Sequence, residues 1–425
     1  MKIDILLGLQ WGDEGKGKVV DVLTPRYDVV ARFQGGPNAG HTLEFDGKKF
    51  VLRSIPSGVF QKDTMNVIGN GVVLDPVLFM DEAKALEEQG VPLHKILVIS
   101  SKAHVIVPTH RYLDAAIEKE KGDRRIGTTG KGIGPAYTEK IGRNGIRVGD
   151  LVGSNFIEVY NDVILKHCRR LEQMLQPVER EEFDKLEQRW LEAVDYLRTF
   201  NITDTSYLIN EKLNRGSHIL CEGAQGTMLD IDFGSYPYVT SSNTVAAGAC
   251  TGLGVAPNRV GDVYGIFKAY CTRVGEGPFP TELFDETGKK IRDIGHEYGA
   301  VTGRERRCGW LDLVALKYAI MINGVTKLIM MKSDVLDTFA QIKVCERYDV
   351  DGVVTDQLPF SFNNNVTPVY RTLEGWNTDL TKIKSSDEFP PLFKEYIKYI
   401  EQQTGVPIVI VSVGPDREQT IELEK

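Results

Sequence analysis

Short, compact apolar runs alternate along the chain with segments of helical periodicity. Six runs, rich in Val, Ile and Leu and without strict alternation of apolar and polar residues, cover 3–9, 27–33, 95–100, 217–223, 326–332 and 407–414. This pattern is typical of strands that are buried on both faces of a parallel sheet. Helical segments lie between the runs, for example at 75–90 and 309–324. The alternation predicts an α/β fold with a large, mostly parallel central sheet flanked by helices.

Residues 155–200 depart from this alternation. They show two amphipathic helical patterns separated near Pro177, and we expect their Arg and Lys side chains to form a solvated helix face. The chain has no internal repeat, low-complexity tract or clear linker. The sequence therefore predicts a single α/β domain over 1–425 with a helical excursion at 155–200.

Composition excludes several classes of protein. A formal net charge of −8 argues against a protein that mainly binds nucleic-acid phosphates, so any phosphate binding must be local. The six cysteines form no C-x-x-C pair, which argues against a zinc site or a disulfide framework. The N-terminal apolar run lacks a cleavage signature, and no run approaches ~18 apolar residues. We expect a soluble, cytoplasmic protein with no membrane or nucleic-acid partner.

The first predicted strand leads into the segment GLQWGDEGKGKVVD, residues 8–21. From Gly12 it reads G-x-x-x-x-G-K, the pattern of a loop whose backbone N–H groups cradle phosphates at a helix start. Lys16 or Lys18 would supply positive charge. The usual magnesium-binding Ser or Thr is replaced by Val19, while the loop contains a carboxylate, Asp13. The pattern alone leaves open what would hold a metal ion.

Two further Gly-rich segments follow. QGGPNAGHT, residues 34–42, carries Asn38 and His41, and a protonated His41 could neutralise a transferring phosphoryl group. IGTTGKGIGPAYTEKIGR, residues 126–143, offers Thr128, Thr129 and Arg143 to another phosphate. Loops at the carboxyl ends of parallel strands gather in one crevice, so we expect these segments to meet. Three such loops predict two phosphorylated ligands.

The second half of the chain adds polar candidates. Gln225 and Thr240 lie in polar loops, and the Gly-bracketed segment 299–309 carries Arg304, Arg306 and Arg307, which could bend around a carboxylate or remain a solvated face. Lys332 and Asp334 form a K-x-D pattern at the end of a predicted strand. This pattern resembles the guanine-reading motif of GTP-binding proteins and favours GTP over ATP.

Together these segments resemble the adenylosuccinate synthetase family, in the same order and over essentially the whole chain. The matching motifs are QWGDEGKGK, GGPNAGHT, GTTGKGIGPAY, EGAQGTMLDID, YPYVTSSNT, GPFPTELFDETG, TGRERRCGWLD and SVGPDR. The resemblance implies a ligase that forms adenylosuccinate from IMP and L-aspartate while GTP is hydrolysed to GDP and phosphate, through a 6-phosphoryl-IMP intermediate.

The resemblance also assigns roles. It implies that Asp13 binds Mg²⁺ together with the Gly40 carbonyl and removes the N1 proton of IMP, and that His41 donates to the phosphoryl oxygens. The implied catalytic residues are Asp13, Lys16, His41 and Gln225. The implied IMP site comprises Asn38, Thr129, Gln225, Thr240, Arg304 and an Arg143 contributed by the neighbouring subunit of a homodimer. The implied GTP site comprises Gly12, Glu14, Gly15, Lys16, Gly17, Lys18, Gly40, His41, Thr42, Arg306, Lys332, Asp334, Ser412 and Gly414. The implied aspartate site comprises Val301, Thr302, Gly303, Arg304 and Arg306.

The chain departs from the family pattern at two positions, and rival functions remain. Glu305 stands where some members carry a basic residue, and Val301 where some carry Thr; we expect Glu305 to face solvent.

A regulatory GTPase would use the same phosphate loop and K-x-D, but it would not need the other Gly-rich loops and the Arg segment together. An ATP-dependent carboxylate-activating ligase lacks the guanine signature, and a nucleic-acid-remodelling NTPase would need a basic surface.

Overall fold

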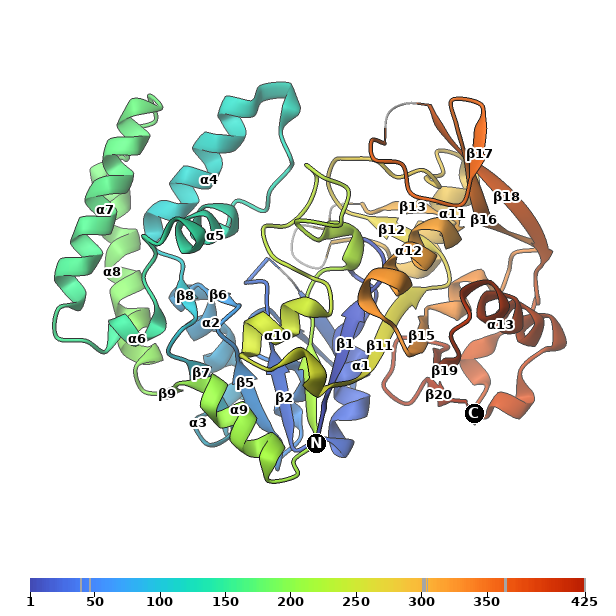
Figure 1. Ribbon diagram of the computed structural model, residues 1–425, viewed down its shortest axis with the longest axis horizontal. Helices are drawn as coiled ribbons and strands as arrows, with labels where there is room; N and C mark the ends of the chain where they lie inside the picture. Colours follow the sequence, from blue (N-terminus) through green and yellow to red (C-terminus); the bar gives the residue numbers. More distant parts are fainter. Residues whose placement is uncertain (39, 46, 300–302, 304, 363–364, 424–425) are drawn as a thin grey trace.

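A computed structural model describes residues 1–38, 40–45, 47–299, 303, 305–362 and 365–423, and within these residues ten strands form one central sheet (Figure 1). Their order across the sheet is β20 (Thr420–Glu422), β19 (Ile408–Ser412), β15 (Lys327–Met331), β11 (Val260–Lys268), β1 (Ile3–Gly8), β10 (Ile219–Glu222), β2 (Val29–Arg32), β5 (Met65–Ile68), β7 (Leu97–Ser100) and β9 (Asn201–Thr203). Neighbouring strands are parallel, apart from the antiparallel pair β19 and β20. The predicted α/β fold with a mostly parallel sheet is confirmed.

Each of the six predicted apolar runs contains one strand of this sheet, trimmed by one or more residues. On β1, Ile3, Ile5 and Leu7 belong to one hydrophobic cluster and Leu6 to another. The strand is therefore covered on both faces, which explains why its sequence shows no alternation.

Helices cover both faces of the sheet (Figure 1). Helix α1 (Lys16–Leu23) packs on one side, where Val19, Val20 and Leu23 share a cluster with Leu6 and Ile266. The other helices are α2 (Pro76–Glu87), α3 (Leu93–Ile96), α4 (Pro108–Lys121), α5 (Ile133–Gly142), α6 (Val148–Leu151), α7 (Phe156–Gln173), α8 (Arg180–Leu197), α9 (Thr205–Asn214), α10 (Ala247–Leu253), α11 (Glu286–Gly295), α12 (Leu313–Asn323) and α13 (Pro391–Thr404). Across the residues that the structure describes, none of these helices is long and apolar enough to cross a membrane.

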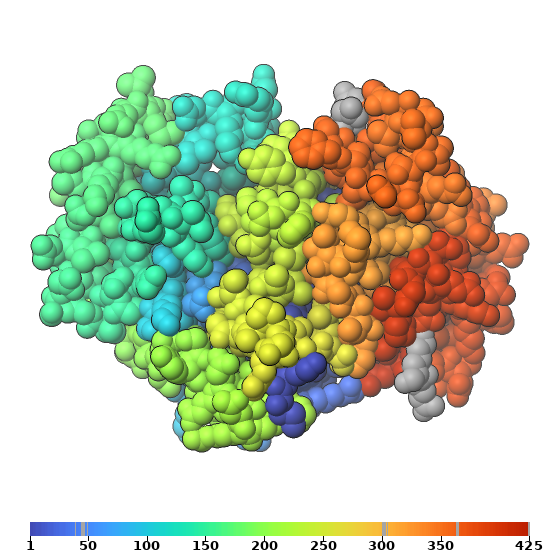
Figure 2. Space-filling view, in the orientation of Figure 1, coloured from blue at the N-terminus to red at the C-terminus, as the bar shows by residue number. Residues whose placement is uncertain are grey.

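Smaller sheets extend this core. Strand β3 (His41–Phe45) pairs with β4 (Lys48–Leu52), β6 (Val73–Leu74) with β8 (His104–Val105), and β12 (Cys271–Arg273) with β13 (Arg307–Gly309). The fourth contains β14 (Leu311–Asp312), β16 (Gln341–Val350), β17 (Val353–Thr355) and β18 (Val366–Glu374). On the face shown in Figure 2, the segment that includes α10, coloured yellow-green to yellow, covers the middle of the molecule. It lies between the teal helices α4 and α5 and the orange C-terminal part.

The helical excursion consists of α7 and α8, as the two amphipathic patterns predicted. Their buried residues do not form a core of their own. Trp190 of α8 and Phe156 of α7 share a cluster with Ile68 and Ile99 of the sheet edge. This shared core supports the single-domain assignment, which stays a prediction.

Replacing Trp190 tests that assignment. Its Nε1–H donates to the carbonyl of Ile106 at 2.9 Å, and its ring stacks on Tyr160 with a centroid distance of 4.8 Å. Trp190→Phe leaves the buried carbonyl without its donor, so we expect the free energy of unfolding to fall by about 1–3 kcal/mol. Urea unfolding, followed by both far-UV circular dichroism and fluorescence, should show one common transition that shifts as a unit.

The matched control is Leu165→Ala, at an exposed position of α7, which should change stability by no more than about 0.5 kcal/mol. A separate early transition for the helical signal, with only that transition shifted by Trp190→Phe, would mean that the excursion is a domain of its own.

Candidate active site

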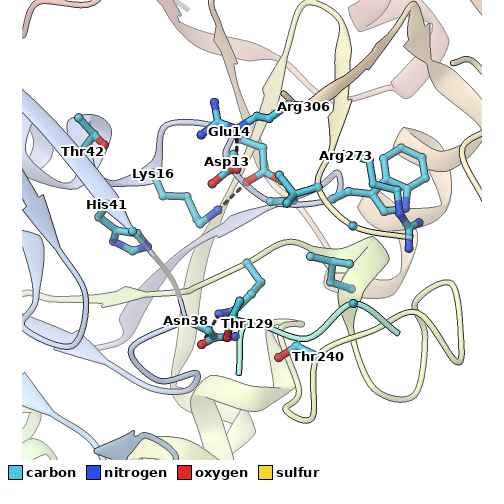
Figure 3. Close-up of a pocket in the computed structure, with 18 of the residues that line it drawn as sticks. Asp13, Glu14, Lys16, Asn38, His41, Thr42, Thr129, Thr240, Arg273 and Arg306 are labelled. Atoms are coloured by element: carbon cyan, nitrogen blue, oxygen red, sulfur yellow. Dashed lines mark hydrogen bonds and ion pairs between the residues drawn. The ribbon is translucent and has the colours of Figure 1, made fainter. Parts of the chain in front are cut away.

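A cavity of about 910 Å³ lies at the carboxyl ends of the parallel strands. The loops that follow β1, β2, β10, β15 and β19 all contribute to its wall, so the expected gathering of the Gly-rich segments is confirmed (Figure 3). The predicted residues that line it are Gly12, Asp13, Glu14, Gly15, Lys16, Gly17, Lys18, Asn38, Gly40, His41, Thr42, Thr129, Gln225, Thr240, Arg306, Lys332, Asp334, Ser412 and Gly414. Gly303 and Arg143 do not line it, whereas Val301, Thr302 and Arg304 lie outside the described residues.

The phosphate-type loop joins β1 to α1, in the predicted order of strand, loop and helix. Gly12, Asp13 and Gly15 all adopt positive φ angles, of 87°, 59° and 93°, which the two glycines accept without strain. The Glu14 side chain is fully buried and accepts hydrogen bonds from the backbone N–H of Gly12 at 2.9 Å and from Lys16 Nζ at 2.5 Å. Glu14 therefore fixes the loop and can reach a ligand through its backbone only.

Lys16 and Lys18 have different surroundings, which separates the two candidates for phosphate binding. Lys18 Nζ donates to Ser412 Oγ at 2.8 Å, to the Gly414 carbonyl at 2.8 Å and to the Gln419 carbonyl at 3.1 Å. Burial lowers the pKa of Lys18 to about 8. Lys18 thus ties the C-terminal loop to α1, and Lys16 is left as the lysine for phosphate. Val19 points into the core beside Leu6 and takes no part in the cavity.

Asp13 sits at the cavity wall with its side chain 36% exposed. Its Oδ2 lies 2.9 Å from Nε of Arg306, whose Nη1 donates to Glu297 Oε2 at 2.6 Å. Figure 3 shows the Arg306 side chain close to Asp13. The Asp13 carboxylate thus has a cation as its partner and is open to a ligand.

His41 stands at the start of β3 with its ring buried. Its Nδ1 lies 2.5 Å from Oε1 of Glu222, a carboxylate that also accepts from the N–H and the hydroxyl of Ser57. Its Nε2 is buried and has no hydrogen-bond partner in the described part of the chain. Burial lowers the pKa of His41, and the nearby charge of Arg32 lowers it further. Burial thus disfavours the imidazolium in the ligand-free protein, while the charge of Glu222 at Nδ1 opposes this effect.

A second group of side chains gathers at the other end of the cavity, where Figure 3 places Asn38, Thr129 and Thr240 together. Asn38 Oδ1 accepts a hydrogen bond of 3.2 Å from Gln225 Nε2. The loop that carries Thr129 is held by Glu118, which accepts from the N–H groups of residues 126–128. Hydroxyl and amide groups thus face a ligand here.

The K-x-D segment follows β15, as predicted. Oδ1 of Asp334 is buried and lacks a hydrogen-bond donor among the described residues. Burial raises the pKa of Asp334, against the opposing charges of Lys332 and Lys18. An unpaired acceptor in a cavity wall needs a donor from the ligand, and the N1–H and amino group of guanine are suitable donors.

Two predictions outside the cavity have different outcomes. Glu305 is 65% exposed and pairs with Arg292 at 2.9 Å, so the expectation that it faces solvent is confirmed. Arg143 caps the C-terminus of α5 and is exposed, away from this chain's cavity.

Sequence reasoning missed several residues that hold the site. Glu222, Glu297 and Lys268 are buried charged residues, and Arg273 lines the cavity. None of the four was selected: Glu222 lies in the matching motif EGAQGTMLDID but was given no role, and the other three belong to no Gly-rich loop or spaced motif. A charged residue inside or next to an apolar strand, such as Lys268 after GIF, is the one signal that points to such positions.

A cluster of potential metal ligands lies outside the cavity lining. Nitrogen atoms of His110 and His167 flank the Glu139 carboxylate, at 2.9 Å and 2.5 Å. The N–H of Val107 donates to Nδ1 of His110, so the proton of this imidazole is on Nε2 and points at Glu139. A metal-bound nitrogen carries no proton, and the other nitrogen then usually donates. These contacts indicate a hydrogen-bonded cluster that joins α4, α5 and α7.

Comparisons with known proteins agree with this geometry. A sequence model described as adenylosuccinate synthetase matches residues 5–421. The chain is 66% identical to the adenylosuccinate synthetases of Phocaeicola vulgatus and Bacteroides thetaiotaomicron, over 99% of each chain. It also matches a structure of fully ligated adenylosuccinate synthetase from Plasmodium falciparum over the full length of both chains, with 37% identity and a TM-score of 0.93. These relatives give no support to a regulatory GTPase. The chain belongs to the adenylosuccinate synthetase family, GTP-dependent ligases that join IMP and L-aspartate in purine biosynthesis.

Proposed function

We propose that the cavity at the carboxyl ends of the strands binds IMP, GTP and L-aspartate together and forms adenylosuccinate through 6-phosphoryl-IMP. The proposal rests on one observation: three polar groups that can still accept a partner from a ligand lie in one cavity. Asp13 offers a carboxylate, His41 an unpaired ring nitrogen and Asp334 an unpaired carboxylate oxygen. A base, a phosphoryl-contacting group and a guanine acceptor are what this reaction needs.

Asp13 is the proposed base. When a phosphate of the bound nucleotide replaces Asp13 as a partner of Arg306, the freed Asp13 carboxylate takes the N1 proton of IMP, and the negative charge moves to O6. O6 then attacks the γ-phosphorus of GTP, the bond to the bridging oxygen breaks, and GDP leaves. The amine of aspartate next attacks C6, and O6 leaves with phosphate. Phosphorylation turns a poor leaving group into a good one.

His41 serves the phosphoryl group. In the free protein, burial lowers the pKa of its ring and so disfavours the imidazolium. The negative γ-phosphoryl group favours the imidazolium, and Glu222 at Nδ1 stabilises that charge. The protonated Nε2 then donates to a phosphoryl oxygen and reduces the charge that builds up during transfer.

The family uses a divalent metal ion, and we assign Mg²⁺. The Asp13 carboxylate and the Gly40 carbonyl would hold it, because hard oxygen donors suit Mg²⁺ and Asp13 is open to the cavity. The ion would offset the charge of the phosphoryl oxygens.

The remaining assignments follow the two ends of the cavity. We assign Asn38, Thr129, Gln225, Thr240 and Arg304 to IMP, with Arg143 supplied by the neighbouring subunit of a homodimer. The residues that we assign to GTP are Gly12, Glu14, Gly15, Lys16, Gly17, Lys18, Gly40, His41, Thr42, Arg306, Lys332, Asp334, Ser412 and Gly414. Among them, Lys18 acts through its hydrogen bonds to Ser412 and Gly414, which hold the C-terminal loop. Residues 301–304 and Arg306 are assigned to aspartate. A cytoplasmic location stays a prediction.

Asp334→Asn tests the guanine assignment. The amide keeps one acceptor but presents N–H groups to the N–H groups of guanine. We therefore expect the Michaelis constant for GTP to rise by about 10- to 150-fold, which corresponds to about 1.5–3 kcal/mol, while that for IMP stays nearly constant. Xanthosine triphosphate has a carbonyl at C2 and should become the better substrate. Steady-state kinetics with each nucleotide measures both effects.

The control for this variant is Asp262→Asn, at an exposed ion pair with Lys327 near the opposite ends of the strands. Equal increases in the Michaelis constants for GTP and IMP, or unchanged preference for GTP, would remove the guanine assignment.

Heterodimers test the shared active site. Asp13→Ala and Arg143→Asn should each be inactive, the first for lack of a base and the second for lack of a guanidinium; Asn tolerates the left-handed backbone of residue 143. A dimer with one chain of each kind contains one intact site, since the Asp13→Ala chain lends its Arg143. Co-expression with two different tags yields this dimer, and its phosphate release should reach about half of the wild-type rate.

An inactive mixed dimer would place Arg143 in its own chain's site. A monomeric wild-type protein in light scattering with all substrates present would rule out the homodimer.

A further inference from the structure

Glu297 follows α11 and is a fully buried carboxylate with four side-chain donors. Its Oε1 accepts from Lys268 Nζ at 2.8 Å, from the Tyr270 hydroxyl at 2.5 Å and from Lys332 Nζ at 3.0 Å. Its Oε2 accepts from Arg306 Nη1 at 2.6 Å. Burial opposes ionisation, but the charges of Lys268, Lys332 and Arg306 outweigh it and hold the pKa of Glu297 well below its ordinary value.

Two of the donors anchor this carboxylate to the central sheet. Lys268 ends β11 and Tyr270 follows it, and both are fully buried. Lys268 Nζ also donates to Thr272 Oγ1 at 2.8 Å, and its backbone N–H donates to Gln10 Oε1 at 3.0 Å. Glu297 is thus fixed relative to β11 and to the segment that leads into the phosphate loop.

The other two donors belong to the cavity. Lys332 lines the cavity two residues before Asp334, and its Nζ also donates to the Gly295 carbonyl at 2.6 Å. These two acceptors hold the ammonium group of the lysine in place. Arg306 reaches Asp13 with Nε while Nη1 stays on Glu297. One carboxylate therefore holds a side chain of the proposed guanine pocket with one oxygen and the partner of the proposed base with the other.

We infer that Glu297 is a positioning residue that connects the guanine pocket to the Asp13 loop. Its Oε1 fixes Lys332 beside the guanine ring of the nucleotide, and its Oε2 fixes Arg306 beside Asp13. This inference rests on the proposed function of the cavity. Removal of the negative charge leaves Lys268, Lys332 and Arg306 close together without their shared anion. Their repulsion displaces the two side chains that are free to move into the cavity, Lys332 and Arg306.

The variant that tests the inference is Glu297→Gln, which keeps the shape and removes the charge. Titration calorimetry with GDP alone should show affinity lowered by about tenfold or more, because charge-assisted hydrogen bonds hold Lys332. Steady-state kinetics should show a higher Michaelis constant for GTP together with a lower kcat. The affinity for IMP alone should stay within about twofold of wild type, because no IMP-site residue contacts Glu297 in the described structure.

Two companion variants separate positioning from folding. Asp312→Asn neutralises another buried carboxylate, whose partners, Tyr348 and Ala315, lie outside the cavity lining; it should lower Tm and leave GDP affinity and kcat unchanged. Glu297→Asp keeps the charge beside Lys268 but is one methylene too short to reach Lys332 and Arg306 at once. Compared with Glu297→Gln, this variant should have a Tm closer to that of wild type, whereas its GDP affinity should remain low. If Glu297→Gln does not fold, Glu297→Asp serves as the test variant.

Three results would overturn the inference: Glu297→Gln behaving like Asp312→Asn, equal losses of GDP and IMP affinity, or full recovery of GDP affinity and kcat in Glu297→Asp. Failure of the proposed function is separate. Wild-type protein that binds GDP but makes no product from IMP, aspartate and GTP would refute the function, while the GDP titrations would still decide the role of Glu297.

Discussion

The strands β1, β2, β10, β15 and β19 run in the same direction, and the positions of most proposed ligand groups follow from this alignment. Parallel strands end at one edge of a sheet, so the loops that follow them meet there although they are far apart in sequence. Residues 8–18 and 412–414 lie at opposite ends of the chain, yet Lys18 joins them through two hydrogen bonds of 2.8 Å. The apolar side chains that cover both faces of these strands hold them in parallel, and the loops at their carboxyl ends then form the cavity.

Charge pairing prepares this cavity for anionic ligands. Before any ligand binds, Lys16 is paired with Glu14, His41 contacts Glu222, and Arg306 is shared by Asp13 and Glu297. Buried charges are costly without partners, so each cation of the site keeps an anion nearby. A phosphate can replace Asp13 as a partner of Arg306, while Glu297 keeps the guanidinium in place. Glu222 and Glu297 are buried outside the cavity lining, so they hold His41 and Arg306 without occupying the space for substrate.

Local patterns in the sequence predicted the features that depend on neighbours along the chain. The runs of apolar residues predicted six strands, and the Gly-rich loops predicted the wall of the cavity. Long-range partners could not be predicted: the contact of Lys18 with Ser412, the role of Glu222 behind His41 and the burial that lowers the pKa of His41 depend on the folded chain. Strand β11 was missed because Gly261, Asp262 and Gly265 interrupt its apolar run. The predictions for Val301, Thr302 and Arg304 fall outside the described residues.

The central claim is that one cavity couples GTP hydrolysis to the joining of IMP and aspartate. Phosphate release from GTP, measured with IMP and aspartate added singly and together, tests it most directly, with product formation followed by absorbance. The account predicts that phosphate and adenylosuccinate form in equal amounts, and only when all three substrates are present. Phosphate release from GTP that proceeds at the same rate without IMP and aspartate would contradict it.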